Sequence, residues 1–125
     1  MDKKEKFIRL AKKLRQSCNH NKTNNRRTSE KQLEIDVTWE EIYVVLEEQD
    51  FKCAFTGIPL EPGYGQSGHL IYEAYHPLAP SLDRIDNDIG YHMDNVRVIL
   101  RFINLGLGGY KGDELSVLKT LGLVP

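Results

Sequence analysis

The chain has 125 residues, 40% of them hydrophobic, which fits one compact domain with a terminal extension. No apolar run is long enough to span a bilayer, and the N-terminus MDKKEKFIRLAKKL is charged where a signal peptide needs an apolar centre. We therefore expect a soluble, cytoplasmic protein with no membrane partner. In that compartment Cys18 and Cys53 are expected to be free thiols.

Charge is divided unevenly along the chain. Residues 1–35 hold eleven Lys or Arg against four acids, whereas residues 36–125 hold six against fourteen. A basic segment on an acidic body indicates a polyanionic partner for the segment and a cation site in the body. A merely solvated helix and tail would have the same composition, so this alternative stays open.

The first half of the chain predicts two helices and a loop-rich region. Apolar residues at helical spacing predict a helix over residues 3–16, followed from Cys18 by a polar linker or exposed arm, CNHNKTNNRRTSEKQ. Thr38 and Glu41 form a capping pattern in front of a second helix of about three turns. Residues 51–79 are punctuated by Gly and Pro, which predicts short strands and loops around CAFTG and LIYEAY.

The second half predicts a strand, a loop and two helices. SLDRI alternates as a strand does, and DNDIGYHMDN has the composition of a loop. VRVILRFINL predicts a helix capped by Asp94 or Asn95. A last helix is predicted after its cap Asp113, with three leucines facing inward: Leu115, Leu118 and Leu121.

Residues 80–104, PSLDRIDNDIGYHMDNVRVILRFIN, concentrate polar side chains suited to a metal site. Asp83 lies in the predicted strand and Asn104 on the predicted helix, so their oxygens can clamp one hard cation. Carboxylate and amide oxygens suit Mg²⁺ or Mn²⁺, which take up charge on a phosphate during phosphodiester cleavage. Turns and helix caps are the other common use of Asp and Asn, and chemistry alone leaves both readings open.

Three stretches together resemble a known family of nucleases. CAFTGIPL, then PSLDRIDNDIGYHMDNVRVI, then IN resemble the HNH (ββα-metal) endonucleases, most closely phage-type members with an SLDRID…GY…NV…N pattern. The resemblance covers residues 39–121. It implies an α+β fold, with a small ββα-metal unit flanked by N-terminal and C-terminal helices. It also implies that Asp83 and Asn104 bind the metal and that Asn95 braces the loop.

The chain departs from the family pattern in two places. Arg84 stands where these enzymes usually carry the histidine that activates water, and a guanidinium stays protonated at any working pH. We therefore expect Arg84 to act on the phosphate, and three residues stay open as the base: His92, His76 and Asp86. Thr56 stands where the second cysteine of a family CxxC pair would be, so two cysteines are too few for a Cys₄ site and no structural zinc is expected.

The resemblance and the charge pattern together predict two segments with different functions. Residues 1–35 form a basic helix and arm that binds DNA phosphates, and residues 36–125 form an HNH-like nuclease domain. The DNA-binding residues of the arm are expected to be Lys12, Lys13, Arg15, Lys22, Arg26 and Arg27. The alternative function is a catalytically silent nucleic-acid-binding relative that lost its base. The sequence leaves open whether a homodimer forms to cut both strands.

Overall fold

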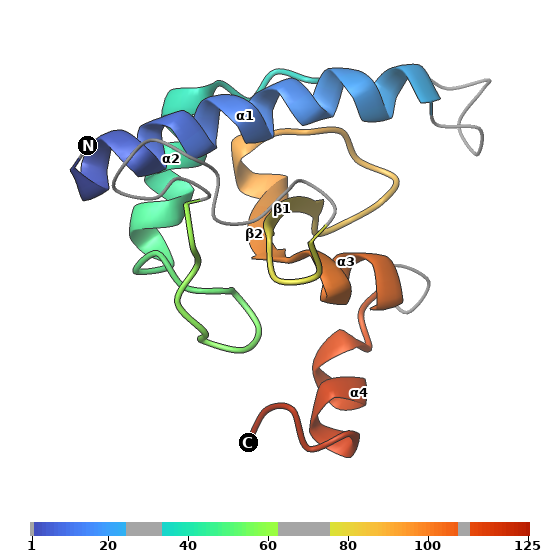
Figure 1. Ribbon diagram of the computed structural model, residues 1–125. Helices are drawn as coiled ribbons and strands as arrows, with labels where there is room; N and C mark the ends of the chain where they lie inside the picture. Colours follow the sequence, from blue (N-terminus) through green and yellow to red (C-terminus); the bar gives the residue numbers. More distant parts are fainter. Residues whose placement is uncertain (1, 25–33, 63–75, 108–110) are drawn as a thin grey trace.

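The computed structural model describes residues 2–24, 34–62, 76–107 and 111–125, with side chains given for all of these except 20–24 (Figure 1). The fold is α+β. Its elements in chain order are α1 (Lys3–Asn24), α2 (Trp39–Glu48), β1 (Pro80–Arg84), a 3₁₀ turn η2 (Met93–Asn95), β2 (Val96–Leu100), α3 (Arg101–Leu107) and α4 (Glu114–Thr120).

Helix α1 is longer than the sequence predicted. The expectation of a linker from Cys18 is wrong for residues 18–24, which continue the helix, while residues 25–32 lie outside the described part. The helix continues because Cys18 is fully buried one turn beyond Leu14, and so extends the apolar stripe that starts at Phe7. Burial also raises the pKa of the Cys18 thiol to about 11, so the free thiol stays protonated.

Helix α2 begins with the predicted capping box. Thr38 Oγ1 accepts a hydrogen bond from the Glu41 amide at 3.2 Å, and the Glu41 carboxylate accepts one from the Thr38 amide at 3.0 Å. The helix packs beneath α1 (Figure 1). Arg15 of α1 donates to the Val37 carbonyl at 2.6 Å, which ties α1 to the chain just before α2.

Residues 49–62 form turns rather than strands. Within this described stretch the pairing is limited to one isolated bridge, Lys52 with Pro59, so the expectation of short strands is wrong here. The predicted strand LIYEAY lies outside the described residues. Gln49 attaches the stretch to the sheet, because its side-chain amide donates to the Val98 carbonyl at 2.8 Å and accepts from the Val98 amide at 2.9 Å.

Strands β1 and β2 form an antiparallel hairpin in which Asp83 lies opposite Arg97. The strand expected at SLDRI is confirmed as β1. The helix expected over VRVILRFINL is half wrong, because Val96–Leu100 is strand β2 and the helix α3 begins only at Arg101. The β-branched residues Val96, Val98 and Ile99 favour a strand once a partner strand is present. Two strands followed by a helix are the result.

Helix α4 differs from its prediction in which residues face inward. Leu118 is buried as expected, but Leu115 and Leu121 are 46% and 64% exposed. Asp113 occupies the N-cap position, yet its side chain makes no capping hydrogen bond. The buried residue of the first turn is Glu114, which is drawn inward by partners in the hairpin described below.

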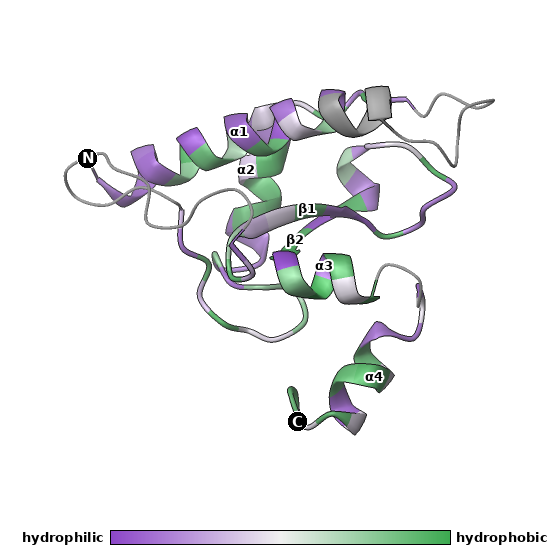
Figure 2. Cartoon of the chain, turned by 45° about the vertical axis from the view of Figure 1, so that its right-hand side comes forward, coloured by the Kyte–Doolittle hydropathy of each residue, from purple (hydrophilic) through white to green (hydrophobic). Residues whose placement is uncertain are grey.

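The hairpin lies between two groups of helices, with α1 and α2 on one side and α3 on the other (Figure 1). The apolar side of α1 faces these elements and its polar side faces away (Figure 2). Residues of α1 belong to the same buried cluster as residues of α2, β1, β2 and α3. Along the described part of the chain, none of the helices has the length and apolar character that crossing a membrane requires.

Candidate active site

The Asp83 carboxylate is buried between two cations. Its side chain is 4% exposed, Arg97 Nε donates to Oδ2 at 2.9 Å, and Lys111 Nζ donates to Oδ1 at 2.5 Å. Lys111 Nζ also donates to the main-chain carbonyl of Arg84 at 2.7 Å. Asp83 lies on the side of β1 that faces α3, because it lines one site together with Asn104 of α3 and Lys111. The side chain of the next residue, Arg84, points to the opposite face.

A second buried carboxylate extends this arrangement. Arg97 Nη2 donates to Glu114 Oε2 at 2.5 Å, the Gly112 amide donates to Glu114 Oε1, and the Arg97 guanidinium lies 4.3 Å from the centre of the Phe55 ring. Desolvation by burial opposes ionisation of Glu114, but the hydrogen bonds from its own amide, Arg97 and Gly112 outweigh it and lower its pKa. Two acids and two bases thus neutralise one another, in a group we call the buried charge cluster: Asp83, Arg97, Lys111 and Glu114.

Asn104, the second metal ligand expected from the sequence, lies beside the buried charge cluster. It lines one closely packed site together with Asp83, Lys111 and Glu114. Its amide nitrogen donates to Ser81 Oγ at 2.8 Å, so the amide oxygen is the atom that a cation would take. The two predicted metal ligands therefore come together on the α3-facing side of the hairpin.

The donor atoms at this place fit a hard divalent cation. Among the described residues no three His, Cys, Asp or Glu side chains gather as ligands. Mg²⁺, however, is commonly held by one or two protein oxygens and keeps its remaining ligands as water or phosphate. The oxygen donors available here are Asp83 Oδ1, the Arg84 carbonyl and the Asn104 amide oxygen. Lys111 Nζ lies within hydrogen-bond distance of Asp83 Oδ1 and of the Arg84 carbonyl.

The side chain of Arg84 lies on the other face of the hairpin, although its carbonyl accepts from Lys111. Its Nη1 donates to the Asn87 carbonyl at 2.8 Å, and its guanidinium carbon lies 5.2 Å from the centre of the Tyr91 ring. The side chain therefore holds the loop between the strands, a positioning role that sequence reasoning missed. A contact between Arg84 and the scissile phosphate stays a prediction, since it requires the guanidinium to reach DNA from this face.

Asn95 fastens the same loop from within. Its amide nitrogen donates to the carbonyls of Asp86, Ile89 and Gly90 at 3.1, 3.3 and 2.9 Å, and its amide oxygen accepts from the Asp86 amide at 2.9 Å. The Asn95 side chain thus joins both ends of the loop through these hydrogen bonds. The carboxylate of Asp86, in contrast, is exposed and accepts from the Asp88 amide at 2.9 Å, which is the geometry of a turn.

The loop is also docked onto the segment that precedes α2. The Tyr91 amide donates to the Glu34 carbonyl at 2.8 Å, and the Tyr91 carbonyl accepts from the amides of Asp36 and Val37 at 3.1 and 3.0 Å. Gly90 permits this approach, because a Cβ atom there would overlap the backbone of Glu34. The loop is thus held on two sides.

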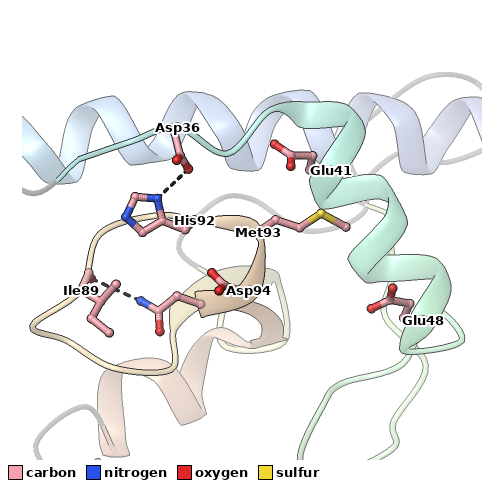
Figure 3. Close-up of a pocket in the computed structure, with 8 residues that line it drawn as sticks. Asp36, Glu41, Glu48, Ile89, His92, Met93 and Asp94 are labelled. Carbon is pink, nitrogen blue, oxygen red and sulfur yellow. Dashed lines mark hydrogen bonds and ion pairs between the residues drawn. The ribbon is translucent and has the colours of Figure 1, made fainter.

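His92 faces an acidic cavity of about 820 Å³ on the α2 side of the loop (Figure 3). Its Nδ1 lies 2.7 Å from Asp36 Oδ1, and Glu41 and Glu48 line the α2 side of the same cavity. The hydrogen bond to Asp36 raises the pKa of His92, more than the partial loss of water lowers it. The imidazolium form of His92 therefore persists to higher pH than in a free histidine.

The other predicted residues are distributed as follows. His76 precedes β1, and its Nδ1 accepts from the Leu78 amide at 3.1 Å. On α1, Lys12 is exposed with its ammonium 4.9 Å from the centre of the Trp39 ring, and Lys13 is half-buried. Arg15 is engaged with Val37, as described above. The side chain of Lys22 and the residues Arg26 and Arg27 lie outside the described part.

Sequence reasoning missed Arg97, Lys111 and Glu114. Arg97 could have been found from the hairpin register, had β2 been recognised as a strand. Lys111 and Glu114 are 28 and 31 positions from Asp83 and follow no local pattern, so only the tertiary structure identifies them.

A scan of protein-family models, a search of curated proteins and a search of solved structures each find no match to this chain.

Proposed function

We propose that this chain is a metal-dependent endonuclease that hydrolyses DNA phosphodiester bonds. The observation that carries the proposal is twofold: Asp83 and Asn104 line one site of a strand–strand–helix unit, and Lys111 Nζ bridges Asp83 Oδ1 and the Arg84 carbonyl there. The order of these elements and the SLDRID…GY…NV…N pattern agree with the HNH resemblance. Under this proposal Asp83 and Asn104 hold one Mg²⁺ or Mn²⁺.

The chain's own residues divide into ligands and supports. When bound, the divalent ion supplies positive charge that stabilises the phosphate and the leaving oxygen. Asp83 and Asn104 hold the ion, and Arg97 keeps the Asp83 carboxylate in place through Oδ2. Asn95 and Arg84 keep the loop between the strands in one conformation, so that the two ligands stay within reach of each other.

Nicking of supercoiled plasmid by the full chain tests the proposal. We expect the parent protein to nick DNA in Mn²⁺ or Mg²⁺ and to be inactive with EDTA. Asp83→Asn removes the charged ligand and should lower the rate about a hundredfold or more, equivalent to about 3 kcal/mol of transition-state stabilisation. Asn104→Ala should also lower it, whereas Asp113→Asn, at an exposed carboxylate outside the site, should not. Metal-independent nicking, or full activity of Asp83→Asn, would contradict the proposal.

A catalytically silent DNA-binding protein is the second candidate. Two observations favour it: both Asp83 oxygens already have cationic partners, and Arg84 stands where the family usually has a histidine. The two candidates differ in the plasmid assay, because a silent protein would retard DNA without nicking it in either metal.

We further propose that Lys12 and Lys13 of α1 contribute phosphate contacts. Lys12→Gln with Lys13→Gln should weaken binding to duplex DNA at low salt and flatten the slope of log K against log salt concentration by about 1 to 2, since each contact contributes about 0.9. Fluorescence anisotropy over a range of salt concentrations measures this. Substitution is preferable to deleting residues 1–35, because α1 supplies core residues.

The matched control is Lys119→Gln, which removes an exposed lysine from α4. It should leave the salt slope as in the parent. If the α1 variant also keeps the parental slope, then Lys12 and Lys13 are only solvated surface residues and the partner surface lies elsewhere.

A further inference from the structure

The Lys111 ammonium lies where two oxygen donors converge. It is 2.5 Å from Asp83 Oδ1 and 2.7 Å from the Arg84 carbonyl, and the Lys111 side chain is 20% exposed against 4% for Asp83. A carboxylate oxygen and a main-chain carbonyl are also ligands that a hard divalent cation takes. One position therefore suits either an ammonium or a metal ion, and both cannot be there at once.

Of the two cations on Asp83, Lys111 is the one that can leave. Arg97 lies directly opposite Asp83 in the hairpin, donates to Glu114 at 2.5 Å and stacks on Phe55, so contacts other than Asp83 hold it in place. Lys111 lies in the turn before α4 on an unbranched four-carbon stem, and both of its oxygen partners belong to the proposed ion site. Rotation of that stem moves the ammonium into water without moving the backbone.

We propose that Lys111 competes with the divalent ion for Asp83. In the ion-free protein the ammonium neutralises the buried carboxylate, and ion entry displaces it. This inference rests on the proposed function, since it concerns the same site. Competition lowers the apparent affinity for the ion in proportion to the fraction of molecules whose site is free of the ammonium. If the Lys111 ammonium occupies the site in about nine of ten molecules, ion binding is weakened about tenfold.

Mn²⁺ binding to the full chain tests the inference without DNA. Calorimetry should show that Lys111→Met binds Mn²⁺ about tenfold more tightly than the parent, because the competitor is gone. Lys111→Arg retains the charge and should bind no more tightly than the parent. Lys119→Met, at an exposed lysine of α4, should match the parent. Asp83→Asn should bind no Mn²⁺, with or without Lys111→Met.

Thermal unfolding supplies a second readout. Without ion, Lys111→Met should melt below the parent, since Asp83 has lost a partner. At one Mn²⁺ concentration its melting temperature should rise more than that of the parent, because tighter binding to the native state stabilises it more. Lys111→Gln serves the same comparison if Lys111→Met does not fold.

Equal or weaker Mn²⁺ binding by Lys111→Met and Lys111→Gln overturns the inference, and so does the absence of Mn²⁺ binding in every variant. The proposed function fails by a different result, which is an Mn²⁺-loaded parent that leaves plasmid DNA intact. A parent that nicks DNA while Lys111→Met binds Mn²⁺ as the parent does would keep the function and remove the competition.

Discussion

Asp83→Ala is expected to lower the free energy of unfolding by about 3 kcal/mol in urea denaturation at neutral pH. The substitution leaves Arg97 and Lys111, which are 18% and 20% exposed, without the carboxylate that they share. Breaking a buried ion pair by removing one partner typically costs about 3–5 kcal/mol, and the partial exposure of both cations places the effect at the lower end. The same variant loses the proposed ion ligand, so metal-dependent nicking should disappear with it.

A double-mutant cycle separates these contributions. Asp83→Ala combined with Lys111→Met should lose less stability than the two single losses added together, by about 1 kcal/mol or more, since the second change removes a cation that the first left unpaired. Asp88→Ala, at an exposed loop position, is the control and should change stability by less than about 0.5 kcal/mol. Additive losses would mean that Lys111 and Asp83 are not coupled in solution.

Asn95→Ala is expected to lower the free energy of unfolding by about 2–3 kcal/mol. The substitution removes the hydrogen bonds to the carbonyls of Asp86, Ile89 and Gly90 and leaves the Asp86 amide without its acceptor. A net loss of about 1 kcal/mol per bond, with an added penalty for a buried group left unpaired, gives this magnitude. Hydrogen exchange of the Asp86 amide should accelerate, which reports on the loop directly.

Two further variants test whether the loop brace is the cause. Asn95→Asp keeps an acceptor for the Asp86 amide but turns an oxygen toward three carbonyls, so it should be at least as destabilising as Asn95→Ala. Asn87→Ala alters an exposed neighbour and should be close to the parent. Parental stability in Asn95→Asp would show that the side chain is not the brace described here.

Local sequence patterns determined several elements correctly. Thr38 and Glu41 predicted the capping box because both hydrogen bonds form within one helical turn. SLDRI predicted β1, and the polar run after it predicted the loop, because alternation and turn-forming residues are local properties. Ligand chemistry and the family resemblance both point to Asp83 and Asn104, and the resemblance points to Asn95. The structure brings Asp83 and Asn104 to one site and Asn95 to the loop carbonyls.

Only the tertiary structure decided the rest. VRVIL suits a buried helix or a strand equally well, and pairing with β1 made it a strand. Cys18 extends α1 because the fold gives it a fully buried position in the core cluster, which the polar sequence around it does not indicate. Arg84 and Asp83 are neighbours in sequence, yet the pleat of β1 sends them to opposite faces. Lys111 and Glu114 join Asp83 and Arg97 across more than a dozen residues, because a buried carboxylate requires partners from wherever the fold supplies them.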